Sequence, residues 1–388
     1  PARFVLTVLF IGAFTMGCAE MLVVGLIELI AVDLSVTVPA AGALVTANAL
    51  GLAVGGPLLT FVTTRFDRRH VLIASTVVFV LGNLLPALGA GYVPFLIARV
   101  IIGAAQGLFI AAAMTTATSV VPPERAGRAM ATVISGFATA SALGLPLGTL
   151  LGQAVGWRGS FIAVDAVAAL VLVVLFAVLP SVPASGETRA LGQAREAFAP
   201  RVLALLGFCA VIFVAIQSAL TYLVPFLSEV SGVSGPLVSA YLLAYGVATT
   251  VGSAAGGRFA DTSSRRALIV GSIGVTASLL AMFVFGANPV VAAIGVLGIG
   301  LFGMGIAPSM QHRVTELSGA GGPLAASLPA SAVNAGIALG SLAGGIAFGI
   351  AGASAAVLTG AVAAALAIAV AWATSFLHPV SQPLRKDA

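Results

Sequence analysis

Long uninterrupted apolar runs are the dominant pattern of this chain. Runs of about 20 apolar residues, the length that a spanning helix needs, predict twelve transmembrane helices. Charged residues and Gly or Pro turn signals separate most of the runs. The predicted helices cover residues 4–30, 40–63, 71–91, 93–119, 128–154, 159–180, 201–228, 236–259, 267–286, 289–312, 323–350 and 353–377. Because the runs do not alternate apolar and polar residues, a transmembrane β-barrel is not expected.

The composition agrees with a membrane protein. The 388 residues are 60% hydrophobic and 7% charged, whereas a soluble domain carries about 25% charged residues. The mean hydropathy is +1.16. The sequence therefore predicts an all-α, multi-pass protein of the lipid bilayer. The first apolar run is too long for a signal peptide and lacks a cleavage site, so no signal peptide is expected.

The basic residues indicate the orientation. If the N-terminus lies inside, 15 of the 17 Lys and Arg residues fall on the cytoplasmic side, the exceptions being Arg99 and Arg158. The positive-inside rule therefore predicts a plasma-membrane protein with both termini cytoplasmic. This placement explains the net charge of +5 without nucleic-acid binding.

The longest polar stretch divides the chain into two halves. Residues 1–180 form a predicted N-terminal six-helix bundle, residues 181–200 a cytoplasmic linker, and residues 201–388 a C-terminal six-helix bundle with a short tail. Two six-helix repeats around a site near the middle of the membrane are typical of secondary transporters.

Two predicted cytoplasmic loops carry similar charges, and we call them the basic loops. They hold Arg65, Asp67, Arg68 and Arg69 after the second helix, and Asp261, Arg265 and Arg266 after the eighth. Such a loop can pair with carboxylates or helix C-termini at the inner face. Simple membrane topology is the alternative explanation of the basic residues.

Three charged residues lie within apolar runs: Glu20, Arg99 and Asp165. Each costs roughly 2.5–3.5 kcal/mol at the centre of a spanning helix, so each is a functional candidate. At Glu20, burial favours the protonated form and a cation such as Arg99 favours the ionised form, a balance that suits proton exchange. We expect Asp165 to face the bundle interior. Two further acids, Glu28 and Asp33, lie nearer the outer surface. Glu28 either makes a proton or cation contact or is a solvated charge.

Two helices carry motifs that resemble a known family. The fourth reads Arg99-Val100-Ile101-Ile102-Gly103-Ala104-Ala105-Gln106-Gly107, and the fifth reads Gly144-Leu145-Pro146-Leu147-Gly148, followed by Gly152. Together with the basic loops, they resemble the major facilitator superfamily over essentially the whole chain. The similarity is greatest to its twelve-span drug:proton antiporters, in the chloramphenicol or arabinose efflux branch. The first basic loop departs from the family pattern, because Thr60 and Thr64 replace a Gly and an Asp.

The resemblance implies a major facilitator fold and a proton-coupled exporter of small, mostly apolar molecules that works by alternating access. Glu20 would then carry the proton and Arg99 would tune it, with Asp165 as a further proton-coupling candidate. The basic loops would form a conformational latch. Gly144, Pro146, Gly148 and Gly152 would form the antiporter motif, which favours export over uptake.

The second half of the chain offers polar candidates for a substrate cavity and no charge within a predicted span. Tyr241 and Tyr245 lie four residues apart, on one helix face. Interhelical packing is the other interpretation of these residues. The candidates, with one from the first half, are Gln106, Gln217, Tyr222, Tyr241, Tyr245, Met304 and Asn334.

The chain shows no phosphate-binding loop, no metal-ligand spacing and no nucleophile constellation. We therefore expect neither an enzyme nor a cofactor or metal, and a proton gradient as the driving force. The expected partners are a small-molecule substrate, protons and lipid, with the protein acting as a monomer. An uptake symporter for sugars or organic acids is the alternative within the same fold. A multi-span enzyme or sensor is less well supported.

Overall fold

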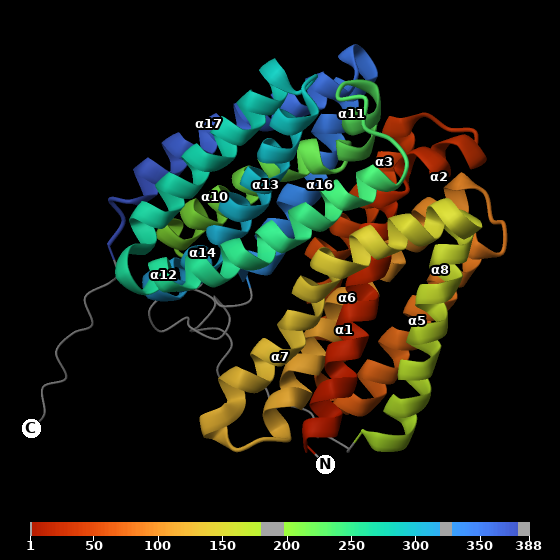
Figure 1. Ribbon diagram of the computed structural model, residues 1–388. Coiled ribbons are helices and arrows are strands. Elements are labelled where there is room, and N and C mark those ends of the chain that lie inside the picture. The colour runs from red at the N-terminus through yellow and green to blue at the C-terminus, as the bar shows by residue number, and fades with distance from the viewer. Residues whose placement is uncertain (1, 180–197, 319–327, 379–388) are drawn as a thin grey trace, which may run out of the picture.

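A computed structural model describes residues 2–179, 198–318 and 328–378 (Figure 1), which are helical and contain no strand. Eleven helical stretches are long and apolar enough to cross a membrane. One of them, Ala126–Val178, turns at Gly156, whose φ of 79° lies in the left-handed region that glycine adopts readily. That stretch therefore makes two crossings, and the twelve predicted spanning helices are confirmed among the described residues.

The first six spans form the N-terminal bundle. Two π-helical turns, η1 and η4, interrupt the second and fifth spans, and each is followed within two residues by a proline, Pro57 or Pro146. The elements are α1 (Ala2–Gly25), α2 (Ile27–Asp33), α3 (Val38–Leu50), η1 (Gly51–Gly55), α4 (Gly56–Val62), η2 (Thr63–Arg65), α5 (Arg68–Ala87), α6 (Tyr92–Ser119), η3 (Pro123–Arg125), α7 (Ala126–Thr139), η4 (Ala140–Gly144) and α8 (Leu145–Val178).

The last six spans form the C-terminal bundle. Most of the predicted linker, residues 181–197, lies outside the described residues. The elements are α10 (Pro200–Leu220), α11 (Leu223–Glu229), α12 (Pro236–Phe285), α13 (Pro289–Gly305), α14 (Ala307–Ser318), α16 (Leu328–Ala351) and α17 (Ala353–Thr374). The helix α12 contains two spans, because the backbone leaves helical geometry at Ser263.

The first span of each bundle is broken near the same end. Leu26 separates α1 from α2, and Thr221 with Tyr222 separates α10 from α11. Both breaks leave a seven-residue helix, α2 or α11. These two short helices contact each other across the two bundles.

The two bundles lean together at one end and diverge toward the other (Figure 1). We call the end where α1 begins and α17 finishes the terminal end, and the opposite end the closed end. One hydrophobic cluster lies within the N-terminal bundle. The other fills the C-terminal bundle and continues into α1, α2 and α3 near the closed end, through residues such as Leu22, Ile27 and Leu44. The apolar core is therefore shared by the two bundles toward the closed end.

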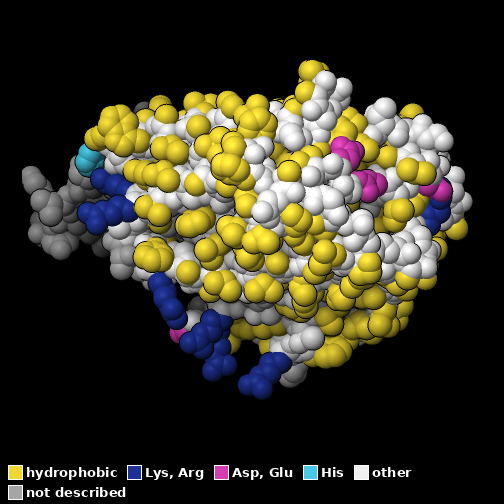
Figure 2. Space-filling view, turned by 45° about the horizontal axis from the view of Figure 1, so that its top comes forward, with side chains coloured by type: hydrophobic (Ala, Val, Ile, Leu, Met, Phe, Trp, Pro, Cys, Tyr) yellow, Lys and Arg dark blue, Asp and Glu magenta, His cyan; other side chains and the backbone are white. Residues whose placement is uncertain are grey.

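Basic and acidic side chains are distributed unequally between the terminal end and the closed end. In Figure 2, Lys and Arg side chains gather toward one end of the molecule, and a broad hydrophobic surface separates them from most of the acidic side chains. Exposed arginines at the terminal end include Arg3, Arg125, Arg128 and Arg258. Because exposed apolar residues such as Leu81 and Val173 cover the belt between the ends, the surface suits contact with lipid.

Candidate functional site

Glu20 lies in the middle of a buried stretch of α1. From Thr15 to Gly25 every residue is buried except Glu20 and its neighbour Met21, which are both partly exposed. Glu20 therefore differs from its buried apolar neighbours both in charge and in being partly exposed.

Arg99 is fully buried on α6 and joins three helices. Its Nη1 donates to the carbonyl oxygen of Ala19 on α1 at 3.2 Å, and its Nε to that of Leu44 on α3 at 3.4 Å. Nη2 has no hydrogen-bond partner among the described residues. Among the residues that the structure describes, Arg99 and Glu20 form no ion pair, although each lies in the electrostatic field of the other. The guanidinium therefore holds the backbone next to Glu20 and supplies positive charge nearby.

Gln106 extends this arrangement by two helical turns. Its Nε2 donates to the carbonyl oxygen of Met16 at 2.9 Å, and its Oε1 accepts from Asn48 Nδ2 on α3 at 2.9 Å. Both side chains are buried. Gln106, predicted to line a substrate cavity, is thus engaged in holding α1. Asn48 was missed by the sequence analysis, since a lone amide in an apolar run gives no sign of its partner.

Glycines allow these helices to approach closely enough for the polar contacts. A Cβ atom on Gly107 of α6 would lie 2.6 Å from the Cα of Gly56, and one on Gly103 would overlap the carbonyl oxygen of Asn48. The glycines of the predicted antiporter motif face α1 instead: Gly144, Gly148 and Gly152 lie against Cys18, Leu22 and Leu26 in turn. In this structure that motif therefore packs α1 within its own bundle.

Asp165 faces the interior of the N-terminal bundle from α8, as expected. Its side chain is 5% exposed. Neither carboxylate oxygen has a hydrogen-bond partner among the described residues. The geometry is compatible with the predicted proton-coupling role but does not place Asp165 beside Glu20.

The C-terminal candidates lie in different environments. Gln217 donates to Thr221 at 3.0 Å, and Tyr222 donates to the carbonyl oxygen of Ser341 at 3.0 Å. Tyr241 reaches the Pro289 carbonyl oxygen at the closed end of α13, at 2.8 Å. Tyr245 is buried, and Met304 is partly exposed. Asn334 is also partly exposed, and its side chain donates to the carbonyl oxygen of Ala330 in its own helix. The structure does not gather the six into one pocket.

The first basic loop is bound to its own bundle. Asp67 accepts from the Arg69 backbone N–H at 2.8 Å and caps α5, and Arg69 Nη2 donates to the Phe176 carbonyl oxygen of α8 at 2.7 Å. Arg68 is buried and donates to Thr64, while Arg65 is exposed. In the second basic loop, Arg265 and Arg266 are exposed, and the side chain of Asp261 lies outside the described residues.

The tenth span extends past its predicted end at residue 312 and buries a basic side chain. Arg313 lies inside α14, which continues to Ser318, with 1% of its surface exposed. It donates to Glu316 at 2.8 Å and to the Leu377 carbonyl oxygen beyond α17. Arg201 Nε donates to the Leu317 carbonyl oxygen at 2.6 Å. The C-terminal bundle thus uses arginines to hold helix C-termini, where positive charge is stabilising.

The closed end is sealed by contacts between the bundles. Ser341 donates to the Gly42 carbonyl oxygen at 3.0 Å, and Thr46 to that of Ala338 at 3.4 Å, joining α3 and α16. On the opposite side, α12 packs on η4 and α8. Because direct hydrogen bonds and close packing join the bundles here, these contacts must break if the bundles rock apart at this end.

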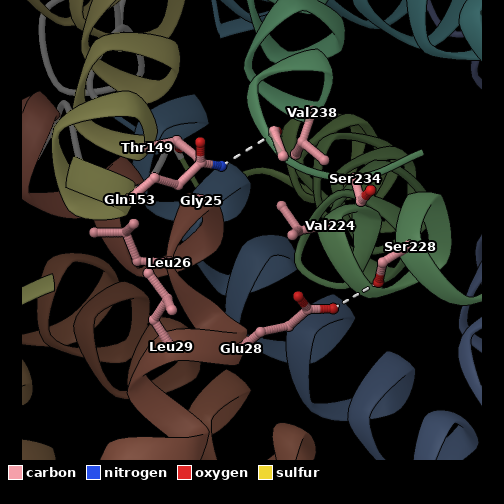
Figure 3. A pocket seen from close by; sticks show the side chains of 11 residues that line it. Gly25, Leu26, Glu28, Leu29, Thr149, Gln153, Val224, Ser228, Ser234 and Val238 are labelled. Atoms are coloured by element: carbon pink, nitrogen blue, oxygen red, sulfur yellow. Dashed lines mark hydrogen bonds between the residues drawn. The ribbon is translucent and has the colours of Figure 1, made fainter. Parts of the chain in front are cut away.

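A pocket of about 130 Å³ lies between the bundles at the closed end (Figure 3). Ser228 of α11 donates to Glu28 Oε1 of α2 at 2.7 Å, and Gln153 Nε2 of α8 donates to the Gly235 carbonyl oxygen at 3.3 Å. Both hydrogen bonds cross from one bundle to the other. Glu28 is the one ionisable side chain among the described residues that line this pocket.

Twelve spanning helices in two bundles, with a partly exposed intramembrane carboxylate, define the class of secondary transporters. The sequence profile of the Major Facilitator Superfamily matches residues 9–326. The chain belongs to this family and is a multi-pass membrane transporter.

Curated relatives and solved structures agree with this assignment. The chain is 32% identical over 336 residues to "Inner membrane transport protein YdhP" of Escherichia coli, covering 87% of this chain and 86% of the relative. It is 31% identical over 345 residues to "Chloramphenicol resistance protein" of Streptomyces lividans, with 86% of each covered. A bacterial homologue of the human lysosomal transporter Spinster, solved in an inward-facing and unoccupied conformation, superposes with a TM-score of 0.80. It shares 17% identity over 96% of this chain and 97% of that one.

Proposed function

We propose that this transporter is a proton-coupled antiporter that exports small, mostly apolar molecules by alternating access. The observation that carries the proposal is Glu20, a partly exposed acid in a stretch of α1 that is buried except for Glu20 and Met21. Buried backbone contacts from Arg99 and Gln106 hold that stretch in place. An intramembrane carboxylate beside a fixed positive charge is suited to binding and releasing a proton.

In this mechanism the terminal end faces the cytoplasm, as the basic residues favour. The structure then corresponds to an inward-open state, with the closed end facing outside. Glu20 takes up a proton from outside and releases it inside, and substrate moves in the opposite direction. A neutral molecule suits a site where the charge of Glu20 is offset by Arg99. Asp165 remains a second proton-coupling candidate.

Two observations favour export. The chain carries the small-residue motif of the fifth span, and one relative is named for chloramphenicol resistance. No cofactor is required, because the proton gradient supplies the free energy, and a single chain holds both bundles. The protein would act in the plasma membrane as a monomer. An uptake symporter is the competing proposal, since the same carboxylate could couple a proton to inward movement.

The test is substrate accumulation in cells with and without the protein. A panel of apolar compounds that includes chloramphenicol should accumulate less in cells that make the protein. Collapsing the proton gradient should remove that difference. Accumulation that is higher in the protein-containing cells would support uptake, and a difference that survives collapse of the gradient would contradict proton coupling.

The orientation makes a separate prediction. Single cysteines at Ser185, in the predicted linker and outside the described residues, and at Ala287, exposed between α12 and α13, should be labelled from opposite sides of the membrane. We expect a membrane-impermeant maleimide to reach Ala287→Cys in intact cells and Ser185→Cys only after permeabilisation. Cys18 and Cys209 are buried and should give little background. Labelling of both positions in intact cells would overturn the orientation.

The first basic loop is expected to affect transport more than binding. Replacing Arg68 and Arg69 by Gln removes the hydrogen bonds to Thr64 and Phe176, far from Glu20. Transport should fall while substrate affinity stays near the wild-type value, because the loop acts on the conformational change. Parallel measurement of transport and equilibrium binding checks this. If affinity falls as steeply as transport in folded protein, the latch proposal is wrong.

A further inference from the structure

Another cavity lies where α3 of the N-terminal bundle packs against α16 of the C-terminal bundle (Figure 1). We call it the lateral groove, and its volume is about 260 Å³. An apolar cavity of about 150 Å³ is already large enough to bind benzene, so the groove has room for a larger apolar group. Its lining includes Ala43 and Thr46 of α3, Ser341, Leu342 and Ile346 of α16, and Tyr222 from the break between α10 and α11.

The polar side chains of the lining already have hydrogen-bond partners. Tyr222 Oη donates to the Ser341 carbonyl oxygen at 3.0 Å, and Ser341 Oγ donates to that of Gly42 at 3.0 Å. Thr46 Oγ1 donates to the Ala338 carbonyl oxygen at 3.4 Å. No charged residue lines the groove in the part of the chain that the structure describes. Because a bound water needs about two to four polar partners, an apolar guest suits this lining better than water or an ion.

The mouth of the lateral groove opens onto the apolar surface of α16. Leu342 and Ile346, four residues apart on one helix face, are 48% and 58% exposed, whereas Tyr222 and Ser341 are buried and form the floor. From Ile346 back to Ser341, α16 lies roughly 8–15 Å from its last residue, Ala351, at a rise of about 1.5 Å per residue. The hydrocarbon core of a bilayer is about 30 Å thick. The groove therefore opens at the depth of the acyl chains of one leaflet.

We propose that the lateral groove binds one acyl chain of a membrane phospholipid, taken from the leaflet at the closed end. The bilayer offers acyl chains at a far higher concentration than any dissolved compound, so mass action favours them as the guest. An empty groove would also forgo dispersion contacts with its lining. Because Ala43 belongs to one bundle and Leu342 to the other, the bound chain bridges the bundles and stabilises the closed arrangement over the open one. This site is separate from the proposed function and holds for either direction of transport.

The test is photo-crosslinking of the purified full chain in phosphatidylcholine nanodiscs. A small fraction of the lipid carries a diazirine in the middle of one acyl chain, and mass spectrometry locates the labelled residues. Labelling should concentrate at Ala43, Leu342 and Ile346, in excess over Leu358 and Val362, which are exposed apolar residues at a similar depth on α17. Phosphatidylglycerol carrying the same chain should give the same pattern, because no charged side chain among the described residues lines the groove. Equal labelling of the two sets of residues would indicate ordinary surface lipid and overturn the inference.

Filling the groove should exclude the acyl chain. Ala43→Phe should lower labelling at Leu342 and Ile346 by about five- to 150-fold, because a Phe ring and an acyl chain would overpack the same space. Ala365→Phe, the same substitution at an exposed position of α17, is the matched control and should leave labelling unchanged. If Ala43→Phe does not fold, Ile346→Trp at the exposed mouth makes the same test without altering the core.

Two results would contradict the inference. The first is labelling that persists in a folded protein whose groove is filled. The second is loss of labelling when chloramphenicol is added in excess, which would assign the groove to a transported molecule instead of lipid. No arm of the experiment measures transport, so failure here is distinguishable from failure of the proposed function.

Discussion

Glu20→Gln is expected to abolish proton-driven efflux, leaving substrate accumulation at the level of cells without the protein. Gln has nearly the same shape but cannot bind and release a proton at physiological pH. The fold should survive, because the bonds that fix this part of α1 use the carbonyl oxygens of Ala19 and Met16, not the Glu20 side chain. Efflux in cells and binding to purified protein measure the two effects separately.

Substrate binding supplies the control for this variant. A neutral substrate should still bind, and its competition with protons should disappear, so that affinity no longer depends on pH. Asp165→Asn is the matched comparison, because it neutralises the other intramembrane acid of the same bundle. If Glu20→Gln binds substrate with the wild-type pH profile, the proton role moves to Asp165, Glu28 or Asp33.

Gly246→Val is expected to reduce transport strongly by disfavouring closure of the outer end. Gly246 of α12 packs on η4 across the bundle interface, where a Cβ atom would lie 2.5 Å from the oxygen and 2.9 Å from the carbonyl carbon of Ala142. Backbone atoms cannot move aside as a flexible side chain can. Overpacking of this kind costs about 1–3 kcal/mol, which lowers the closed-to-open ratio by about five- to 150-fold. The distance between spin labels at Leu88 and Ala287, exposed residues near the closed end on different bundles, should lengthen while efflux falls.

Gly257→Val is the matched control on the same helix. A Cβ atom there meets no heavy atom within 4 Å, so the identical substitution should leave both the distance and efflux close to wild type. Loss of helix propensity is common to the two variants and cannot separate them. Wild-type efflux by Gly246→Val, with the closed-end distance unchanged, would show that this contact does not limit the conformational change.

The sequence by itself determined the twelve spans and the asymmetry of basic residues. A spanning helix needs only a run of apolar residues that matches the bilayer thickness, which is a local property of the chain. The motifs around Arg99 and Pro146 also identified the family, now supported by the match over residues 9–326. For the same reason the intramembrane charges could be selected as candidates: a charge in an apolar run is costly wherever its partner lies.

Only the tertiary structure decided which of these groups meet. Arg99 pairs with backbone carbonyls of α1 and α3 instead of forming an ion pair with Glu20 among the described residues, and Arg313 is buried inside α14. Glu28 and Ser228 are 200 positions apart in the chain. Their contact depends on how two helices are broken and rotated and how closely the bundles approach. Close approach is set by packing of small residues between helices, so the pattern along one helix does not contain it.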